Sequence, residues 1–410
     1  MGETHFDPTA ADFLADPYPV LAALREATPV LRHEGLDRWF VTRHADVRAC
    51  LRDRRLGRNY RHVGTDAEFR AEPLDPRWQA FWDVERWSLL WLEPPDHTRI
   101  RKLVASAFTP RSVEAMREPA ARFAGGLLEP LVERGEMDLL YDFAQPYSVG
   151  LICDWLGVPS DNHRDLLDWS HAMVKMYEFD TTPEQAVAAD EAAAAFRDFS
   201  LELIAERRRA PRGDLVSRLV EARVDGGHLS DAEIVSTVIV LLNAGHEATV
   251  NTLGNGVRAL MEHRGQWERL VEGSVAAVDA IEELIRYDPP LQLFERWVLE
   301  DGVEVAGVPI PRGEKVSLLF GSANRDPRVF TSPDEFDVGR PNAAEHIGFG
   351  GGIHVCIGAP LARIELEEAL RALVERCPRL ELTAEPTRNQ AFVIWGCERV
   401  ELSITQRERI

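Results

Sequence analysis

One short stretch near the C-terminal end, residues 349–360 with the sequence FGGGIHVCIGAP, restricts the possible folds of this chain more than any other feature. Its three consecutive glycines cost backbone entropy and bring no side chain to a core, so they indicate a tight turn or a close approach of the backbone to another group. Cys356 lies just before a predicted helix over residues 361–376, and the N-terminal end of a helix favours the thiolate form of a cysteine. The stretch therefore predicts a thiolate on a glycine-rich loop, acting as a nucleophile or as a metal ligand.

Several interpretations compete for this loop. A phosphate-binding loop would need Gly-Lys-Ser or Gly-Lys-Thr after the glycines, and the chain lacks both there. A structural zinc site would need about four ligands in paired spacing, whereas His354 and Cys356 have no second pair nearby. A cysteine nucleophile would need a base that the sequence does not single out, and an inert buried cysteine is the plain alternative. A single axial thiolate on a haem iron agrees best with the pattern.

The stretch resembles the haem-binding loop of the cytochromes P-450, Phe-Gly-x-Gly-x-His-x-Cys-x-Gly. The chain matches every specified position, namely Phe349, Gly350, Gly352, His354, Cys356 and Gly358. The resemblance extends over nearly the whole chain and implies a mainly α fold with a small β region, in which haem is buried between a long central helix and the Cys356 loop. It also implies haem b (iron protoporphyrin IX) with Cys356 as the axial thiolate and with Phe349, Gly350 and Gly358 around it.

Length, charge and cysteine usage set further limits. The 410 residues contain no linker or low-complexity segment, so we expect one domain over residues 1–410. No apolar run of about 18 residues occurs, and residues 1–6 contain no signal-peptide pattern, so a cytoplasmic protein without a membrane segment is expected. The net charge of −21 argues against binding of nucleic acid or of anionic membranes. Five scattered cysteines predict reduced thiols.

Hydrophobic periodicity and turn residues predict many helices and a few short strands. The expected β-rich parts are roughly residues 28–43, 293–320 and 379–405, and the last part includes strands over residues 379–382, 392–395 and 400–404. The expected helices cover residues 18–27, 45–53, 93 onward, 111–134, 145–157, 163–177, 183–209, 214–222, 230–260, 276–287 and 361–376. The helix over residues 183–209 is amphipathic, and we expect it to cover a pocket as a mobile lid, although a plain surface helix would have the same pattern.

The helix over residues 230–260 is expected to cross the centre of the molecule. A capping box of Ser230 and Glu233 begins it, and residues 238–242 are apolar on every side. Glu247 follows in the segment AGHEATV (residues 244–250), where a buried carboxylate costs stability and so indicates a function. The segment resembles the family motif that lines the oxygen-binding side of haem, which implies a place for Ala244 beside the cofactor.

This segment departs from the family at one position. The family's usual threonine, whose hydroxyl holds the water that protonates iron-bound peroxide, is replaced by Ala248, and Thr249 comes one residue later. One residue along a helix is about 100° of rotation, so Thr249 cannot occupy the same place. One alternative is a merely weaker protonation route that leaks peroxide. We favour the other, in which Glu247 and Thr249 organise water together with a hydroxyl group of the substrate.

Two further constellations follow from the resemblance. His97 and Arg101 share a helix face and would ordinarily be a solvated pair, but the resemblance implies that they bind the haem propionates together with Arg296 and His354. Glu283 and Arg286 stand three residues apart and could be a surface ion pair. The resemblance implies instead a buried network of Glu283 and Arg286 with Arg340, which fixes the loop that presents the thiolate.

The resemblance implies a haem-thiolate monooxygenase that inserts one oxygen atom from O2 into a small to medium lipophilic substrate, with secondary metabolism as one setting. The alternatives are an atypical oxidation such as oxidative coupling, or a haem-binding sensor without turnover. No flavin or iron–sulfur motif is present, so we expect a ferredoxin and its reductase to supply electrons to a monomer, with the ferredoxin docking near Arg99, Lys102, Arg111 and Arg363. The predicted substrate pocket comprises Trp87, Leu90, Val240, Ala244, Leu293, Phe294 and Ile394.

Overall fold

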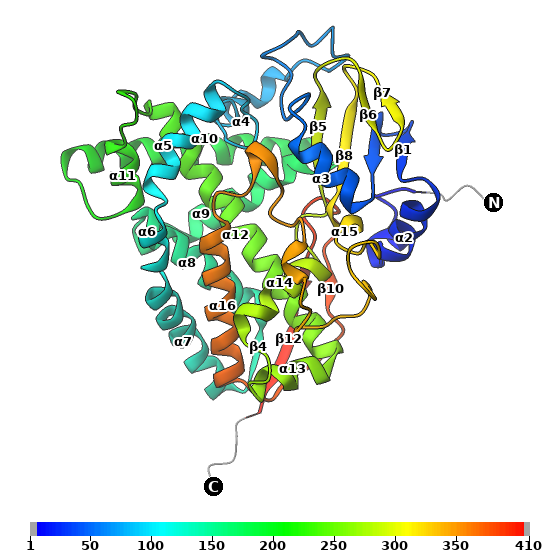
Figure 1. Cartoon of the computed structure of the whole chain (residues 1–410). Coiled ribbons are helices and arrows are strands. Elements are labelled where there is room, and N and C mark those ends of the chain that lie inside the picture. Colours follow the sequence, from blue (N-terminus) through cyan, green and yellow to red (C-terminus); the bar gives the residue numbers. More distant parts are fainter. Residues whose placement is uncertain (1–5, 406–410) are drawn as a thin grey trace.

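The computed structural model describes residues 6–405, and its helices and its main sheet occupy different parts of the molecule (Figure 1). The α-helices are α1 (Ala11–Ala15), α2 (Tyr18–Ala27), α3 (His44–Arg52), α4 (Gln79–Glu85), α5 (Asp96–Ala107), α6 (Pro110–Glu114), α7 (Arg117–Arg134), α8 (Gln145–Leu156), α9 (His163–Val174), α10 (Pro183–Arg209), α11 (Leu215–Glu221), α12 (Asp231–Glu262), α13 (Arg264–Val271), α14 (Ala277–Tyr287), α15 (Phe320–Ala323) and α16 (Ala359–Arg376). Helices dominate, so the expected mainly α fold is confirmed.

Within residues 6–405, the strands are short and form four small sheets. They are β1 (Val30–His33), β2 (Arg38–Val41), β3 (Leu56–Gly57), β4 (Glu136–Asp138), β5 (Leu293–Val298), β6 (Val303–Val305), β7 (Val308–Ile310), β8 (Lys315–Leu319), β9 (Leu380–Leu382), β10 (Thr387–Arg388), β11 (Cys397–Arg399) and β12 (Glu401–Ile404). The largest sheet has the order β1-β2-β8-β5-β3, in which β1 and β2 form the predicted hairpin and β8 runs parallel to β2. This sheet lies beside α2 and α3, at the upper right of Figure 1.

Helix α12 is the central element of the helical part. Its N-terminal end has the predicted capping box, in which the side chains of Ser230 and Glu233 accept hydrogen bonds from each other's backbone N–H groups. Residues 234–243 of α12 are all buried, and the helix packs against α8, α10, α14 and α16. Burial of this apolar segment on every side explains why its sequence lacks a polar face.

Two predicted elements differ from the structure. The helix expected over residues 111–134 is divided into α6 and α7, because Thr109 caps the first turn of α6 and this helix already ends at Glu114. The strand expected over residues 392–395 is absent apart from one bridge between Leu291 and Ile394. The backbone N–H groups of Val393 and Ile394 donate to the Glu178 carboxylate at 3.0 and 2.9 Å. A side chain thus takes the place of a neighbouring strand.

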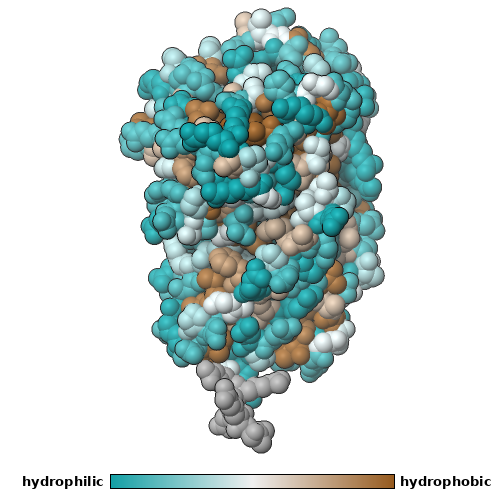
Figure 2. Space-filling view, turned by 90° about the vertical axis from the view of Figure 1, so that its left-hand side faces the viewer, coloured by the Kyte–Doolittle hydropathy of each residue, from teal (hydrophilic) through white to brown (hydrophobic). Residues whose placement is uncertain are grey.

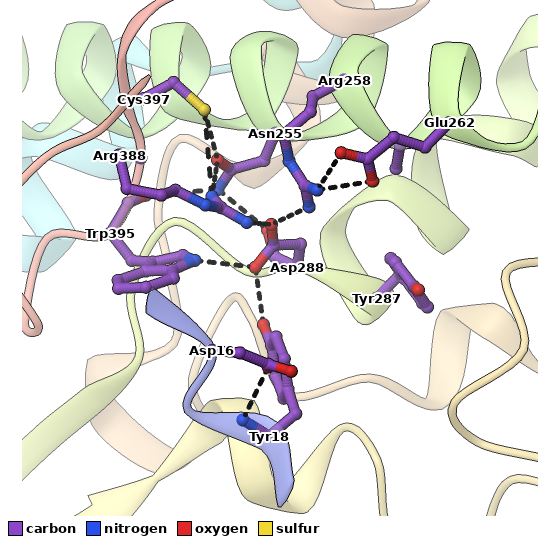
Figure 3. Close-up of polar contacts among 12 residues, drawn as sticks. Asp16, Tyr18, Asn255, Arg258, Glu262, Tyr287, Asp288, Arg388, Trp395 and Cys397 are labelled. Atoms are coloured by element: carbon purple, nitrogen blue, oxygen red, sulfur yellow. Dashed lines mark hydrogen bonds and ion pairs between the residues drawn. The ribbon is translucent and has the colours of Figure 1, made fainter. Parts of the chain in front are cut away.

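One fully buried carboxylate joins segments that are distant in the sequence. Asp288 follows α14, and Figure 3 shows it at the centre of converging donors. It accepts hydrogen bonds from the Tyr18 hydroxyl (2.6 Å), the Trp395 indole N–H (2.8 Å), Arg258 (2.9 Å) and Arg388 (2.7 Å). The neighbouring guanidiniums hold the pKa of Asp288 well below its usual range, although its burial acts in the opposite direction.

The surface is largely polar. Figure 2 shows a mostly hydrophilic face with small separate apolar patches. Within residues 6–405, no helix is both long enough and apolar enough to cross a membrane.

Candidate active site

The glycine-rich loop before α16 packs closely on the backbone of α3. Gly350 and Gly352 have φ angles of +68° and +64°, which side-chain-bearing residues rarely adopt. A Cβ atom on Gly352 would clash with the carbonyl oxygen of Leu51. The Cys356 N–H donates to the carbonyl oxygen of Phe349 at 2.9 Å and closes the loop. The glycines are therefore required by local conformation and by contact with α3.

Cys356 differs from the other four cysteines because it is exposed, whereas Cys50, Cys153, Cys377 and Cys397 are buried. Although the residue is exposed, nearby protein atoms partly desolvate the Cys356 thiol and raise its pKa, and the backbone N–H groups of Gly358 and Ala359 at the start of α16 oppose this effect. The start of α16 therefore favours the thiolate, in the direction that the sequence predicts, and desolvation opposes it. A bound metal ion would add positive charge and favour the thiolate further.

His97 and His354 lie against each other near this loop. Their ring centroids are 4.5 Å apart, and His354 Nε2 lies 3.1 Å from Glu93 Oε1. His97 is buried, and neither of its ring nitrogens has a hydrogen-bond partner among the residues that the structure describes. Desolvation, followed by the charges of His354 and Arg101, lowers the pKa of His97 to about 4. Arg101 donates to the carbonyl oxygen of Val355 at 2.6 Å.

Two buried guanidiniums lie close to this pair. Within the described residues, the guanidinium groups of Arg296 and Arg58 donate hydrogen bonds only to backbone carbonyl oxygens, those of Leu90 and Glu295. Neither has an ion pair within the described chain, and desolvation lowers the pKa of Arg58 to about 9 and that of Arg296 to about 10. Sequence reasoning missed Arg58, because only the pairing of Gly57 with Trp297 places it beside Arg296.

These donors fit the cofactor that the sequence implies. Haem brings two carboxylates, and buried carboxylates require charged or hydrogen-bonding partners. His97, Arg58 and Arg296 are buried donors without a carboxylate partner, and the exposed Cys356 thiol supplies a candidate iron ligand. The residues present therefore agree with a haem-thiolate site.

A largely apolar cavity of about 350 Å³ lies beside α12. Of the predicted pocket residues, its lining includes Leu90, Ala244, Leu293, Phe294 and Ile394. Two predictions do not hold for this cavity. Trp87 lines a neighbouring cavity instead, which shares Arg58 and Trp91 with this one. Val240 is buried within α12 and lines neither cavity. Val240 lies about one turn before Ala244 on the same side of α12, but neighbouring side chains bury it, whereas Ala244 and Ala248 are exposed.

One acidic residue of α12 contributes to the lining of this cavity. Glu247 lines it beside Ala244 and Ala248, and desolvation raises the pKa of the Glu247 carboxyl to about 7. Thr249 is buried and is not part of the lining. Its hydroxyl oxygen lies 2.9 Å from the carbonyl oxygen of Gly245 and 3.2 Å from the Glu365 carboxyl group, both within hydrogen-bond distance. The expectation that Thr249 and Glu247 act together at the cavity is thus wrong, because the rotation along the helix turns Thr249 toward α16.

The three residues of the expected buried network lie together. Arg286 donates to both carboxylate oxygens of Glu283, at 2.6 and 2.8 Å. The Arg340 Nε atom lies 3.2 Å from the same carboxylate. Arg286 also donates to the carbonyl oxygens of Asn324 and Pro333, and Glu283 and Arg286 have no exposed side-chain surface. This network joins α14 to the segment that leads into the Cys356 loop.

The sequence of this chain is similar to those of known proteins over most of its length. A family model described as Cytochrome P-450 matches residues 162–394. The polyketide biosynthesis cytochrome P-450 PksS of Bacillus subtilis is 36% identical over 99% of this chain and 100% of its own length. The 6-deoxyerythronolide B hydroxylase of Saccharopolyspora erythraea is 38% identical over 90% of this chain and 91% of its own.

Solved structures show the same relationship. P450BioI, solved in complex with an acyl carrier protein ligated to hexadec-9Z-enoic acid, superposes with a TM-score of 0.90. It is 32% identical, and the superposition covers 96% of this chain and 99% of that one. Sequence identity and fold agree over nearly the full length, and the chain therefore belongs to the cytochrome P-450 family.

Proposed function

We propose that this enzyme is a haem-thiolate monooxygenase in which Cys356 is the axial iron ligand. Its substrate is a small to medium lipophilic molecule that gains one oxygen atom from O2. The observation that carries the proposal is the exposed Cys356 on a glycine-rich loop, together with buried donors that lack carboxylate partners. When bound, haem with a thiolate ligand supplies the reductive activation of O2. The 410 residues are proposed to act as one cytoplasmic, monomeric domain.

The haem carboxylates are assigned to five residues. His97, Arg101, Arg296 and His354 follow from the sequence, and Arg58 is added because its buried guanidinium lies beside Arg296. Burial lowers the pKa of both guanidiniums, and pairing with a carboxylate would offset that cost.

Glu247 is proposed to carry protons into the cavity. A carboxyl group with a pKa of about 7 can both release and accept a proton near neutral pH. Ala248 presents only a methyl group to the cavity, and the Thr249 hydroxyl is engaged elsewhere. A hydroxyl group on the substrate would complete a proton path that the chain itself leaves incomplete. The names of the polyketide and 6-deoxyerythronolide relatives are consistent with an oxygenated substrate.

Electrons are proposed to come from a ferredoxin that docks near Arg99, Lys102, Arg111 and Arg363. Ion pairs already occupy Arg99 with Glu233, Lys102 with Asp225 and Arg363 with Glu282. Arg111 is exposed and has no ion pair within the described residues, so it is the cation most available to an acidic partner.

Optical spectroscopy tests the haem-thiolate assignment. The reduced CO complex should show the red-shifted Soret band of thiolate ligation, and Cys356→Ala should lose it. Cys377→Ala is the matched control, since Cys377 is buried at the C-terminal end of α16, opposite the end that follows the loop, and should leave the band intact. Loss of the band in the control alone, or its retention in Cys356→Ala, would contradict the proposal.

Turnover with a surrogate ferredoxin, its reductase and NADPH separates the remaining alternatives. A monooxygenase product gains one oxygen atom, whereas oxidative coupling removes two hydrogen atoms without adding oxygen. Substrate binding without substrate-dependent NADPH oxidation would instead favour a haem-binding sensor.

A further inference from the structure

Three potential metal ligands converge where α9 packs against α12. They are His171 of α9 and the adjacent residues His246 and Glu247 of α12. His171 Nε2 lies 3.4 Å from His246 Nε2 and 3.3 Å from Glu247 Oε1. His246 Nε2 lies 4.0 Å from the same carboxylate oxygen. No local sequence pattern indicates this cluster, because His171 is 75 residues from His246.

The spacing of these atoms matches a metal centre. A triangle with sides of 3.4, 3.3 and 4.0 Å has a centre about 2.1 Å from each corner, close to the length of a Zn–N or Zn–O bond. Hydrogen bonding accounts poorly for the arrangement. Glu247 Oε1 is buried and accepts no hydrogen bond from the described chain, and the contact between the two imidazoles is long.

The chemical type of the ligands also suits a metal ion. A neutral imidazole keeps a lone pair on one ring nitrogen and is the commonest metal ligand among side chains. Two imidazoles and a carboxylate form a ligand set typical of zinc and unsuited to magnesium or calcium.

We propose that His171, His246 and Glu247 bind a divalent transition-metal ion of the zinc class, which links α9 to α12 and holds the Glu247 carboxylate. Access is open at His171, whose side chain is 39% exposed, while His246 is fully buried. The ion would compete with protons and water for Glu247. Metal binding is independent of the proposed function, and only the resulting inhibition rests on the assigned role of Glu247.

Direct binding measurement on the purified full-length chain, with its haem content determined, tests the site. Equilibrium dialysis with Zn2+ followed by metal analysis should give one zinc ion per chain that Mg2+ does not displace. His171→Ala should weaken this binding at least about tenfold, because one of three protein ligands is lost. X-ray absorption at the zinc edge should show nitrogen and oxygen ligands at about 2.0–2.2 Å.

His228→Ala is the matched control, because this histidine is exposed and lies outside the cluster. It should bind zinc as the natural chain does. If His171→Ala does not fold, His171→Gln provides the same test with a side chain of similar size. Equal zinc affinity in the natural chain and in either His171 variant would overturn the proposal.

Activity gives a second readout. The ratio of turnover with zinc to turnover without zinc should fall well below one for the natural chain and return toward one for His171→Ala. Stoichiometric zinc binding without any turnover would support the metal site while contradicting the proposed monooxygenase function.

Discussion

Burial sets the protonation state of Glu365, whose carboxyl group lies between α12 and α16. Glu365 of α16 is buried, and its carboxyl group is hydrogen-bonded to the Thr249 hydroxyl of α12 at 3.2 Å. Desolvation raises the pKa of Glu365 to about 8, although the Thr249 hydrogen bond opposes the shift. Around neutral pH, Glu365 is therefore mostly a neutral acid that can donate a hydrogen bond.

This shift predicts a pH-dependent effect of Glu365→Gln. Between pH 4.5 and 8 the unfolded chain ionises Glu365 while the folded chain keeps it protonated, so folding stability falls as the pH rises through this window. Glutamine does not titrate. A change of one in pKa is worth about 1.4 kcal/mol, so the variant should gain on the order of a few kcal/mol relative to the natural chain between pH 5 and 9.

Thermal unfolding at several pH values measures this difference. Glu375→Gln is the control, because Glu375 is exposed on the same helix and should show no such trend. A parallel pH response of the natural chain and Glu365→Gln would show that Glu365 is already ionised in the folded protein.

Ala248→Thr tests whether the cavity lacks a hydroxyl group. Position 248 faces the cavity, so the new hydroxyl would lie within it beside Glu247. Positioned proton transfer contributes about 10²–10⁴-fold to rates, so even a partly restored path should change the ratio of product to hydrogen peroxide about twofold or more. The effect should be largest with substrates that lack a hydroxyl group. Haem content, measured optically, should not change, and an unchanged ratio for every substrate would argue against a substrate-assisted path.

At the scale of elements, buried charges connect segments that hydrophobic packing alone would leave free to shift. Asp288 binds donors from α2, α12 and the C-terminal segment that contains Arg388 and Trp395 (Figure 3). Glu283 does the same for α14 and the segment before the Cys356 loop. Both oxygens of each carboxylate accept hydrogen bonds, and a buried charge is tolerated under this condition.

Asp288→Asn should therefore destabilise the fold by about 3–5 kcal/mol at pH 7, because Arg258 and Arg388 lose their buried counter-charge. The pKa of Asp288 is depressed, so its contribution is present above the ordinary aspartate pKa of about 3.9 and is lost as the pH falls below that value. The difference between the two proteins should narrow accordingly below pH 4.

Denaturant unfolding measures the loss. Glu262→Gln is the matched control, since Glu262 pairs with the same Arg258 but is 40% exposed, and a pair of this kind is worth about 0–1 kcal/mol. Similar losses in both variants would mean that burial does not distinguish the two carboxylates.

For the whole molecule, the charge distribution bears on the choice of redox partner. A net charge of −21 would repel an acidic ferredoxin, so docking must depend on a local basic area. Most cations of the proposed area are paired within the chain. Arg111 on α6 is exposed and is the exception among them.

Arg111→Glu should slow ferredoxin-dependent reduction roughly three- to tenfold at low salt, because charges at the rim of an interface act mainly on association rate. Reduction by dithionite, which needs no docking, should be unaffected. Stopped-flow measurements at two ionic strengths check the result, and the difference should shrink at high salt. The control variant Arg164→Glu changes an exposed position on α9, and ferredoxin should reduce this variant at the natural rate. An equal loss in both variants would place the docking area elsewhere.

The sequence by itself determined the family, the mainly α fold and the bounds of long periodic helices such as α10 and α12. It did so because these depend on local pattern, on capping residues and on a loop motif that requires glycines. Tertiary structure decided what no local pattern encodes. Strand pairing placed Arg58 beside Arg296, and Glu178 replaced a strand partner at residues 393 and 394. Helix packing brought His171 to Glu247, and rotation along α12 turned Thr249 toward Glu365. Such contacts depend on where distant segments meet, and the pKa values that follow depend on the burial that those meetings create.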